Sequence, residues 1–547
     1  MFKISSQKWL IFILVLAFLI RIAGVSYGLP LWLVDDEPPF VLAALKMLEL
    51  KTLLPVLHLA DFKTVLYYPP YFSYLYLPFF AALVAVKFLF YKGAANLFAA
   101  YLLSDLSQFF IIARVINIFV GAASVYLIYK IAKNIFADET PALFAAFFVA
   151  TSLIHTAISM TSRHWLSVFF FSALVLFWLS HPDLSEKKRY FRAVFFAGLG
   201  VGVAVINSLL AILIALWYLL YEKGMALRLF KEKFFYLLYA IFGALFTLPY
   251  ILYPESLGFK ADITAETAKT ILGAVTSPIF FTKTIAASEF ILIAFAAAGL
   301  IFSFKKSRNV FWTFAAFIYA YSIIFYLVFR FEPRFFMGLL PFYVILAGYG
   351  FWESQKLISN RILANVFALI LLVPLIFTLR LDWLAIKNDS RTLALTWAEA
   401  NIPARSKIMV LARLTNLPTN KAAVAEQEKL DPASLRKVNL AQAEIAENSP
   451  DFKSFHALNL RDLSNESFYE NIDSYVKQNH YEYLFIQLAY RDSERFKNIT
   501  KNATLLKSYA GGDSRLSLAE SQFIANPLGL FKISELGPRI EIYKINQ

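Results

Sequence analysis

The sequence predicts an α-helical polytopic membrane protein with about 11 transmembrane helices, followed by a C-terminal soluble α/β domain. Hydrophobic residues make up 59% of the 547 positions, charged residues only 16%, and the mean hydropathy is +0.59. Apolar runs of roughly 20 residues, the length that crosses a bilayer, recur as far as Arg380. Beyond Arg380 these runs stop and charged and amide side chains become frequent.

Charge and cysteine content exclude several classes of function. The net charge of +14 comes largely from Lys and Arg in short loops between apolar runs, as the positive-inside rule predicts, and not from a nucleic-acid-binding surface. The absence of cysteine excludes disulfides and thiolate metal sites. The 56 Phe, 29 Tyr and 9 Trp suit membrane interfaces and stacking on ring-shaped ligands.

The first apolar run, from Trp9 to Leu29, has no small-residue cleavage site, so we interpret it as a retained first span. Lys3 and Lys8 precede it, which places the N-terminus in the cytoplasm. The apolar stretch from Tyr71 to Tyr91 decides the topology of everything after it. If this stretch does not cross, many more Lys and Arg fall in cytoplasmic loops than outside, so we assign it to a long first external loop, residues 30–112, as juxtamembrane or re-entrant helix.

The other spans follow from the apolar runs, and the odd total leaves the C-terminus outside. They are predicted at 113–129, 141–158, 165–180, 193–206, 208–222, 234–252, 287–304, 309–329, 335–351 and 362–380. The membrane domain is predicted as 1–384 and the external α/β domain as 385–547. In the latter, strands are expected at Ile408–Ala412, Tyr483–Gln487 and Ile540–Ile545, and a helix at Thr392–Asn401 before Pro403.

An acidic cluster, Asp35, Asp36 and Glu37, stands just past the first span and is followed by Pro38 and Pro39. Carboxylates are costly at a membrane and mark candidate functional sites there. A carboxylate in this place suits a general base that takes a proton from a hydroxyl as it attacks a sugar carbon. The alternative interpretation is a solvated cap, with the prolines ending one helix and opening the next.

Other polar groups fall on the same external face. Arginines at headgroup depth suit a phosphate leaving group, because the guanidinium fork matches phosphate oxygens. For Arg330 and Arg334 the alternative is a loop in which both arginines pair with Glu332. For the tyrosines the alternative is an ordinary position at the membrane interface. His58 and Asp61 have helical i, i+3 spacing, but two ligands are too few to define a metal site. The remaining external candidates are Tyr67, Tyr68, Tyr71, Arg163, His164, Arg330 and Arg334.

The order of these motifs resembles membrane-embedded glycosyltransferases of the GT-C type, in particular the dolichyl-phosphate-mannose protein mannosyltransferase and aminoarabinose transferase group. That group carries an Asp-Glu pair early in the first external loop, matched by Asp36-Glu37, and a later Pro-Pro motif, matched by Pro69-Pro70. It then has an Arg heading a Gly-containing span and an Arg-aromatic motif before a Pro. The matching residues here are Arg114, Gly121, Tyr129, Lys130 and Lys133, and then Arg334, Phe335, Phe336 and Pro341.

The chain departs from this pattern at two places. Many relatives have a second acid in the next external loop, where this chain has Ser162-Arg163-His164-Trp165. A basic residue often ends the following Gly-rich segment, where this chain has Asn207. Both departures bear on which substrate the site would take.

The resemblance implies a GT-C fold and transfer of a sugar, with inversion, from a polyprenyl-phosphate donor to an external glycan, lipid or protein acceptor, in the cell (plasma or inner) membrane. The catalytic candidates are Asp36, Asp35 and Glu37, with Asp36 as the base. The candidates for binding substrate and lipid phosphate are Arg330, Arg334, Tyr68, Tyr71, Arg163 and His164. No metal ligands are assigned, no cofactor is identified, and a divalent-metal requirement stays open. Two other functions remain: a lipid-linked-sugar transporter or flippase, and a non-catalytic scaffold.

Overall fold

The structure is a computed structural model of the chain. It describes residues 5–34, 36–63, 65–66, 68–254, 270–328, 333–413, 415–430, 432, 435–449, 451–460, 468, 470–487, 494–512, 518 and 526–546.

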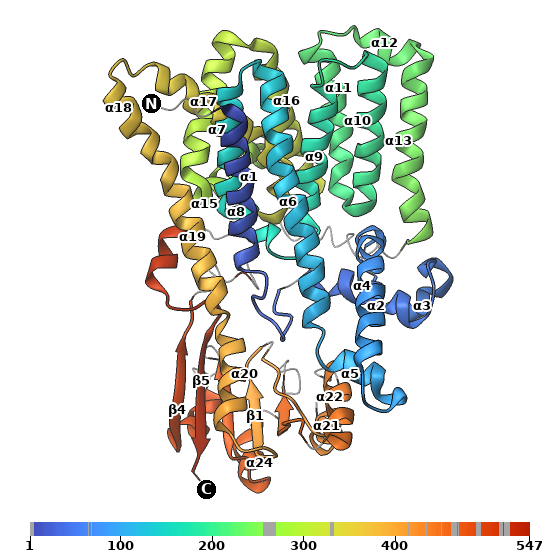
Figure 1. The fold of residues 1–547 in the computed structure, drawn as a ribbon, viewed down its shortest axis with the longest axis vertical. Coiled ribbons are helices and arrows are strands. Elements are labelled where there is room, and N and C mark those ends of the chain that lie inside the picture. The colour runs from blue at the N-terminus through green and yellow to red at the C-terminus, as the bar shows by residue number, and fades with distance from the viewer. Residues whose placement is uncertain are drawn as a thin grey trace.

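A large helical bundle forms one end of the molecule and a smaller sheet domain the other, with the N-terminus at the end of the bundle away from the sheet (Figure 1). The main apolar core of the bundle contains residues from Ile13 to Leu371, so helices from both ends of the membrane domain contribute to it. The bundle helices are α1 (Ser6–Ala23), α6 (Ser107–Phe136), α7 (Glu139–Thr151), α8 (Leu153–Ser159), α9 (Trp165–Leu179), α10 (Glu186–Val203), α11 (Leu210–Leu216), α13 (Lys233–Leu252), α15 (Ile271–Lys306), α16 (Arg308–Val328), α17 (Leu340–Lys356), α18 (Arg361–Ala368) and α19 (Leu372–Lys387).

The predicted helical membrane architecture is confirmed, whereas the number of spans stays a prediction. Each predicted span overlaps one of these helices. By length and composition, 7 helices of the described residues could cross a membrane, or up to 8 if a bent pair is one span. The bent pair, α7 and α8, turns by 57° inside the segment that the sequence predicted as the single span 141–158.

The first external loop of the prediction is largely helical. It contains α2 (Pro38–Glu49), η1 (Pro55–His58), α3 (Leu59–Phe62), α4 (Tyr71–Phe90), η2 (Ala95–Leu97) and α5 (Phe98–Ser104). Pro38 occupies the first position of α2 and Pro70 is the N-cap of α4, as the fixed φ of proline favours.

Helix α4 is apolar and long enough to pass as a span; in Figure 1 it lies beside α2, on the side of the bundle that faces the sheet domain. Its start contacts α2, where the Ser73 hydroxyl donates to the Phe40 carbonyl at 3.0 Å. After its end the chain enters α5, which packs on α22 (Lys437–Asn448) of the sheet domain. Both ends of α4 thus lie on the sheet side of the bundle, and its assignment to an external loop stays a prediction.

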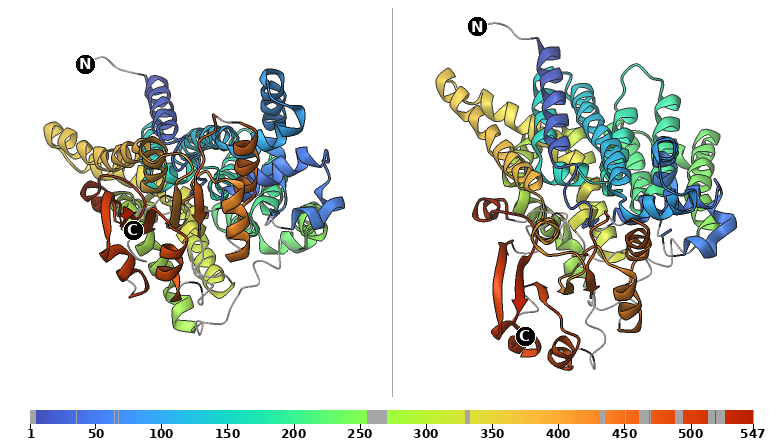
Figure 2. Two further views of the ribbon diagram at one scale, coloured as in Figure 1. Left: turned by 90° about the horizontal axis from the view of Figure 1, so that it is seen from below. Right: turned by 60° about the horizontal axis from the view of Figure 1, so that its bottom comes forward.

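The C-terminal domain is α/β, as predicted. Its five strands are ordered β2-β1-β3-β5-β4; β1 is parallel to β2 and β3, and β5 is antiparallel to β3 and β4. The strands are β1 (Lys407–Leu411), β2 (His456–Asn459), β3 (Tyr483–Gln487), β4 (Ala503–Ala510) and β5 (Arg539–Ile545). The helical elements are α20 (Ser390–Asn401), α21 (Lys421–Leu430), α22, α24 (Ile472–Gln478), α26 (Glu494–Lys501) and η9 (Pro527–Lys532). Seen from below, α21 and α22 lie beside the blue helices of the first external loop (Figure 2).

The two parts are joined by buried and partly buried polar contacts beside the first external loop. The Tyr27 hydroxyl donates to Asp389 Oδ2 at 2.6 Å, and the Gly28 amide donates to Asn388 Oδ1 at 2.7 Å. Asp389 also pairs with Arg391 at 2.8 Å, and both of these side chains are fully buried. The start of the C-terminal domain is therefore tied to the residues that lead into the acidic cluster.

Candidate active site

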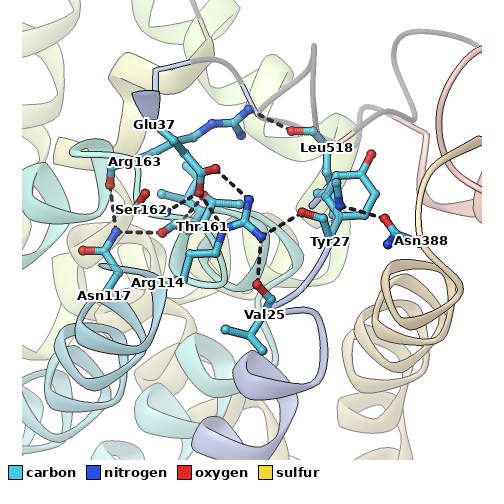
Figure 3. Close-up of polar contacts among 12 residues, drawn as sticks. Val25, Tyr27, Glu37, Arg114, Asn117, Thr161, Ser162, Arg163, Asn388 and Leu518 are labelled. Atoms are coloured by element: carbon cyan, nitrogen blue, oxygen red, sulfur yellow. Dashed lines mark hydrogen bonds and ion pairs between the residues drawn. The ribbon is translucent and has the colours of Figure 1, made fainter. Parts of the chain in front are cut away.

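Glu37 is fully buried and holds three parts of the chain together (Figure 3). Its Oε1 and Oε2 accept from Arg114 Nε at 2.9 Å and Nη2 at 2.7 Å. Oε1 also accepts from the Ser162 amide at 2.6 Å. Arg114 donates onward to the Val25 and Tyr27 carbonyls at 2.8 and 2.7 Å. Both charges are thus paired and hydrogen-bonded, which is what burial of an ion pair requires.

One turn further along α6, Asn117 fixes the next external loop. Its Nδ2 donates to the Thr161 carbonyl at 2.7 Å and to the Arg163 carbonyl at 3.1 Å (Figure 3). Residues 114 and 117 face the same way because positions three apart share a helix face. Helix α6 therefore locates both the acidic cluster and the loop from Thr161 to Trp165.

Asp36 differs from its neighbour because its side chain keeps 23% of its surface exposed. Its Oδ2 accepts from Arg334 Nη1 at 2.8 Å and from the Trp165 indole at 3.1 Å. The backbone here has a φ of +70°, a left-handed conformation that Asp tolerates better than most residues. The side chain is thus held between the first external loop, α9 and the segment before α17.

Burial alone would raise the pKa of Asp36, but its surroundings outweigh this. The positive charges of Arg334, His164 and Arg163 and the hydrogen bond from Trp165 together hold its pKa below the ordinary value. Asp36 is therefore an anion at neutral pH, which is the protonation state that a general base needs.

Aromatic rings surround this carboxylate. The ring centroids of Tyr68 and His164 are 4.3 Å apart, those of His164 and Trp165 4.1 Å, and those of Phe40 and Tyr68 5.4 Å. Burial, and then the charge of Asp36, raise the pKa of Tyr68, so its phenol stays protonated. Such faces can stack on a sugar ring.

Tyr71 and Arg163 have different surroundings. A Cβ at Gly202, near the end of α10, would lie 2.0 Å from the Tyr71 ring, so glycine makes room for this side chain. Burial raises the pKa of Tyr71.

Arg163 is fully buried and its Nη2 donates to the Leu518 carbonyl of the C-terminal domain at 2.8 Å (Figure 3). Arg163 therefore connects the site to that domain.

The chain bends between α7 and α8, and the loop from Thr161 to Trp165 that follows α8 lies beside Asp36. Arg21 of α1 donates to the Val149 and Ala150 carbonyls at 3.0 and 3.1 Å, where α7 ends. Glu289 of α15 accepts from the Ser152 hydroxyl at 2.7 Å and the Ile154 amide at 2.9 Å, where α8 begins. Backbone groups left free by a bend need such partners inside a membrane.

The structure brings Asp36, Arg334, His164, Tyr68 and Arg163 together, as the sequence predicted for one site. Glu37, predicted as a catalytic candidate, has both carboxylate oxygens bonded to Arg114. Asp35 and Arg330 lie outside the described residues, as do Tyr67 and Glu332.

Trp165, Ser162 and Asn117 were not singled out for the site, and Arg114 was noted only as part of a motif. The signal for Arg114 was available, because an arginine within a predicted span needs a buried anion and the acidic cluster is the nearest external one.

The two departures from the family pattern also find a structural account. The loop without an acid supplies donors to Glu37 and Asp36, and Asn207 closes α10 by donating to the Gly200 carbonyl at 2.8 Å.

Among the residues that the structure describes, no group of three or more His, Asp or Glu side chains is arranged to hold a metal ion. His58 and Asp61 lie 3.8 Å apart as an exposed pair.

Comparison with known families gives a match over residues 98–253 to the family described as "Dolichyl-phosphate-mannose-protein mannosyltransferase". This match confirms the resemblance inferred from the motifs, and its range includes Arg114, Asn117 and the loop from Thr161 to Trp165. No curated protein sequence matches the chain.

Two solved structures are similar to the chain along most of its length. One is ArnT from Cupriavidus metallidurans bound to undecaprenyl phosphate, with 11% identity, a TM-score of 0.47, and coverage of 99% of this chain and 98% of that one. The other is the oligosaccharyltransferase AglB from Archaeoglobus fulgidus, in complex with an inhibitory peptide and a dolichol-phosphate. It has 13% identity, a TM-score of 0.48, and coverage of 92% of this chain and 73% of that one.

Proposed function

We propose that the chain is an integral membrane glycosyltransferase that moves a sugar from a polyprenyl-phosphate donor to an external acceptor. The observation that carries this proposal is the Asp36 carboxylate, held by Arg334 and Trp165 beside closely packed aromatic rings. The family match supports it, because its name specifies a dolichyl-phosphate-linked sugar and its range includes half of the site.

Asp36 acts as the base in this proposal. It accepts the proton of an acceptor hydroxyl while that oxygen forms a bond to the anomeric carbon. The bond from this carbon to the phosphate oxygen breaks at the same time, and its electron pair leaves with the polyprenyl phosphate. Attack opposite the leaving group inverts the configuration of the anomeric carbon.

Arg334 takes two partners in turn. Without donor its guanidinium pairs with Asp36 at 2.8 Å. A donor phosphate would compete for the same group, since guanidinium binds phosphate oxygens in a planar fork. Transfer of Arg334 to the phosphate leaves Asp36 as a stronger base and also stabilises the leaving group. Arg330, predicted for the same phosphate, remains a second candidate.

Glu37 has a supporting role in this account. Its carboxylate already accepts three hydrogen bonds, so it holds Arg114 and Ser162 in place and leaves proton transfer to Asp36. Tyr68 and His164 would border the sugar, and Arg163 would add positive charge beside it. The acceptor is a glycan, lipid or protein on the external side of the cell membrane, with the N-terminus in the cytoplasm and the C-terminal domain outside.

The experiment that tests this function is transfer of labelled sugar from polyprenyl phosphate in reconstituted vesicles. Arg334→Ala should lower the use of donor by about 10- to 150-fold, because a charged hydrogen bond contributes about 1.5–3 kcal/mol. The matched control is Arg308→Ala, which starts α16 at the opposite end of the bundle and should transfer normally. Normal transfer by Arg334→Ala would show that this arginine only pairs with Asp36. No transfer by the unaltered protein, with any polyprenyl-phosphate sugar, would overturn the proposal.

A further inference from the structure

The helices α10, α11, α12 (Ala226–Lys231) and α13 lie side by side in the bundle end away from the C-terminal domain (Figure 1). Side chains from all four line an apolar groove. The groove and the open space at its mouth together amount to about 520 Å³. Its walls are aromatic and aliphatic, and include Tyr190, Tyr218, Leu229, Phe235, Tyr239 and Phe242. Grooves of this kind suit an acyl chain, which needs apolar contact and no hydrogen bonds.

The short helix α12 borders this groove and is amphipathic. Met225, Leu227 and Phe230 leave 68%, 58% and 67% of their surfaces exposed. Arg228 and Lys231 are the basic residues of its last turn. A helix that exposes large apolar side chains beside basic ones is typical of a segment that lies at the headgroup level of a bilayer.

The acidic groups at the mouth of the groove are paired with two arginines. Glu222 accepts from Arg189 at 2.6 Å and from the Tyr190 hydroxyl at 2.9 Å. Glu232 and Glu186 both pair with Arg228, at 2.5 and 3.5 Å. Three carboxylates thus face two arginines, so one negative charge remains, and the surrounding lysines outnumber it.

Lys188, Lys223, Lys231 and Lys233 are exposed around the same end of the groove. Within the part of the chain that the structure describes, none of the four has a carboxylate at ion-pair distance. A cluster of lysines at headgroup depth attracts anionic lipid, by about 1 kcal/mol for each residue. The distribution of basic loops places this end in the cytoplasm, where the leaflet is negatively charged.

We propose that this groove binds one anionic phospholipid, with an acyl chain between α10 and α13 and the phosphate among Lys223, Lys231 and their neighbours. The apolar groove accommodates the chain and the lysines select the charge. A free phosphate would use only the second of these features. This site lies at the opposite end of the bundle from Asp36 and needs no part of the proposed sugar transfer.

The test is native mass spectrometry of the full chain, stripped of lipid and then given phosphatidylglycerol or phosphatidylcholine in mixed micelles. One phosphatidylglycerol should bind well above the level of phosphatidylcholine. Lys223→Gln with Lys231→Gln should weaken it by about 30-fold, the effect of two surface lysines. The matched control is Lys305→Gln with Arg308→Gln, which removes the same charge at the α15–α16 turn of the same bundle end and should change binding less than about twofold.

A second variant tests the chain-binding part. Ala215 lines the groove, so Ala215→Trp should fill it and abolish lipid retention while leaving every lysine in place. Inorganic phosphate should not compete with the lipid at equal concentration. Equal binding of both lipids, equal loss in the two charge variants, or full competition by phosphate would each overturn the proposal.

Discussion

The pairing of Glu37 with Arg114 gives the sharpest prediction about stability. Both side chains are fully buried, and the carboxylate accepts three hydrogen bonds of 2.6–2.9 Å. Glu37→Ala leaves the guanidinium buried without a counter-charge, which costs about 3–5 kcal/mol. This is a large fraction of the roughly 5–15 kcal/mol that stabilises a typical folded protein.

The assay is thermal denaturation of the detergent-solubilised protein, followed by the loss of its folded peak on size exclusion. Glu49→Ala is the matched control, since it removes the carboxylate of the last residue of α2, whose side chain is 61% exposed and pairs with Lys46 at 3.1 Å. An ion pair with one partner in solvent at the protein surface contributes about 1 kcal/mol or less. Glu37→Ala should therefore lower the melting temperature markedly and Glu49→Ala hardly at all.

A double variant separates pairing from other effects of Glu37. Because the two side chains bond to each other, Glu37→Ala with Arg114→Ala should be no less stable than either single variant. If Glu37→Ala instead keeps the stability of the unaltered protein and only loses sugar transfer, Glu37 is a catalytic group and the reasoning here is refuted.

Three further predictions concern the surroundings of Asp36 and the topology. Arg334→Ala removes the positive charge that lowers the pKa of Asp36 most, so burial should dominate and this pKa should rise. The pH at which the transfer rate falls on the acidic side should therefore move upward. An unchanged pH profile would contradict this. Glu289→Ala should slow transfer because the α7–α8 break loses its acceptor, whereas Glu289→Gln, which keeps a carbonyl oxygen, should restore most of it; equal loss would exclude a positioning role. Reporter fusions after Tyr91 and Gly511 should report the outside and a fusion after Lys233 the cytoplasm, and a cytoplasmic result at Tyr91 would mean that α4 crosses the membrane.

The pattern of apolar residues in the sequence predicted most helices of the bundle and three strands of the sheet. It predicted the helices of the bundle because burying apolar surface in lipid decides them without reference to distant residues. It missed the bend between α7 and α8, because Arg21 and Glu289, which satisfy the broken backbone, come from helices far away in the sequence. In the C-terminal domain β1, β3 and β5 were predicted from their apolar runs. The strand β2 has only four residues, too few to show a pattern, and β4 is largely exposed, so neither was predicted.

The position of the candidate site could also be predicted, but the roles within it could not. Asp36 and Glu37 are adjacent acids with different partners, which are Arg334, 298 positions from Asp36, and Arg114, 77 positions from Glu37. Trp165 appeared as one of many interfacial aromatics until its indole was found to donate to Asp36. Chemistry at this site therefore depends on contacts between remote segments, which composition and spacing do not report.

The most direct test of the account is sugar transfer by Asp36→Asn, measured from labelled polyprenyl-phosphate sugar in membranes with matched expression. Asparagine keeps the shape and can still accept from Trp165, but it cannot take the proton of the acceptor. Transfer should fall by roughly 10²–10⁴ while the protein still folds and binds the donor. Asp105→Asn, a change of the same kind at an exposed loop position that bonds to Ser107, should transfer normally. Full transfer by Asp36→Asn would contradict the central claim that this carboxylate is the base.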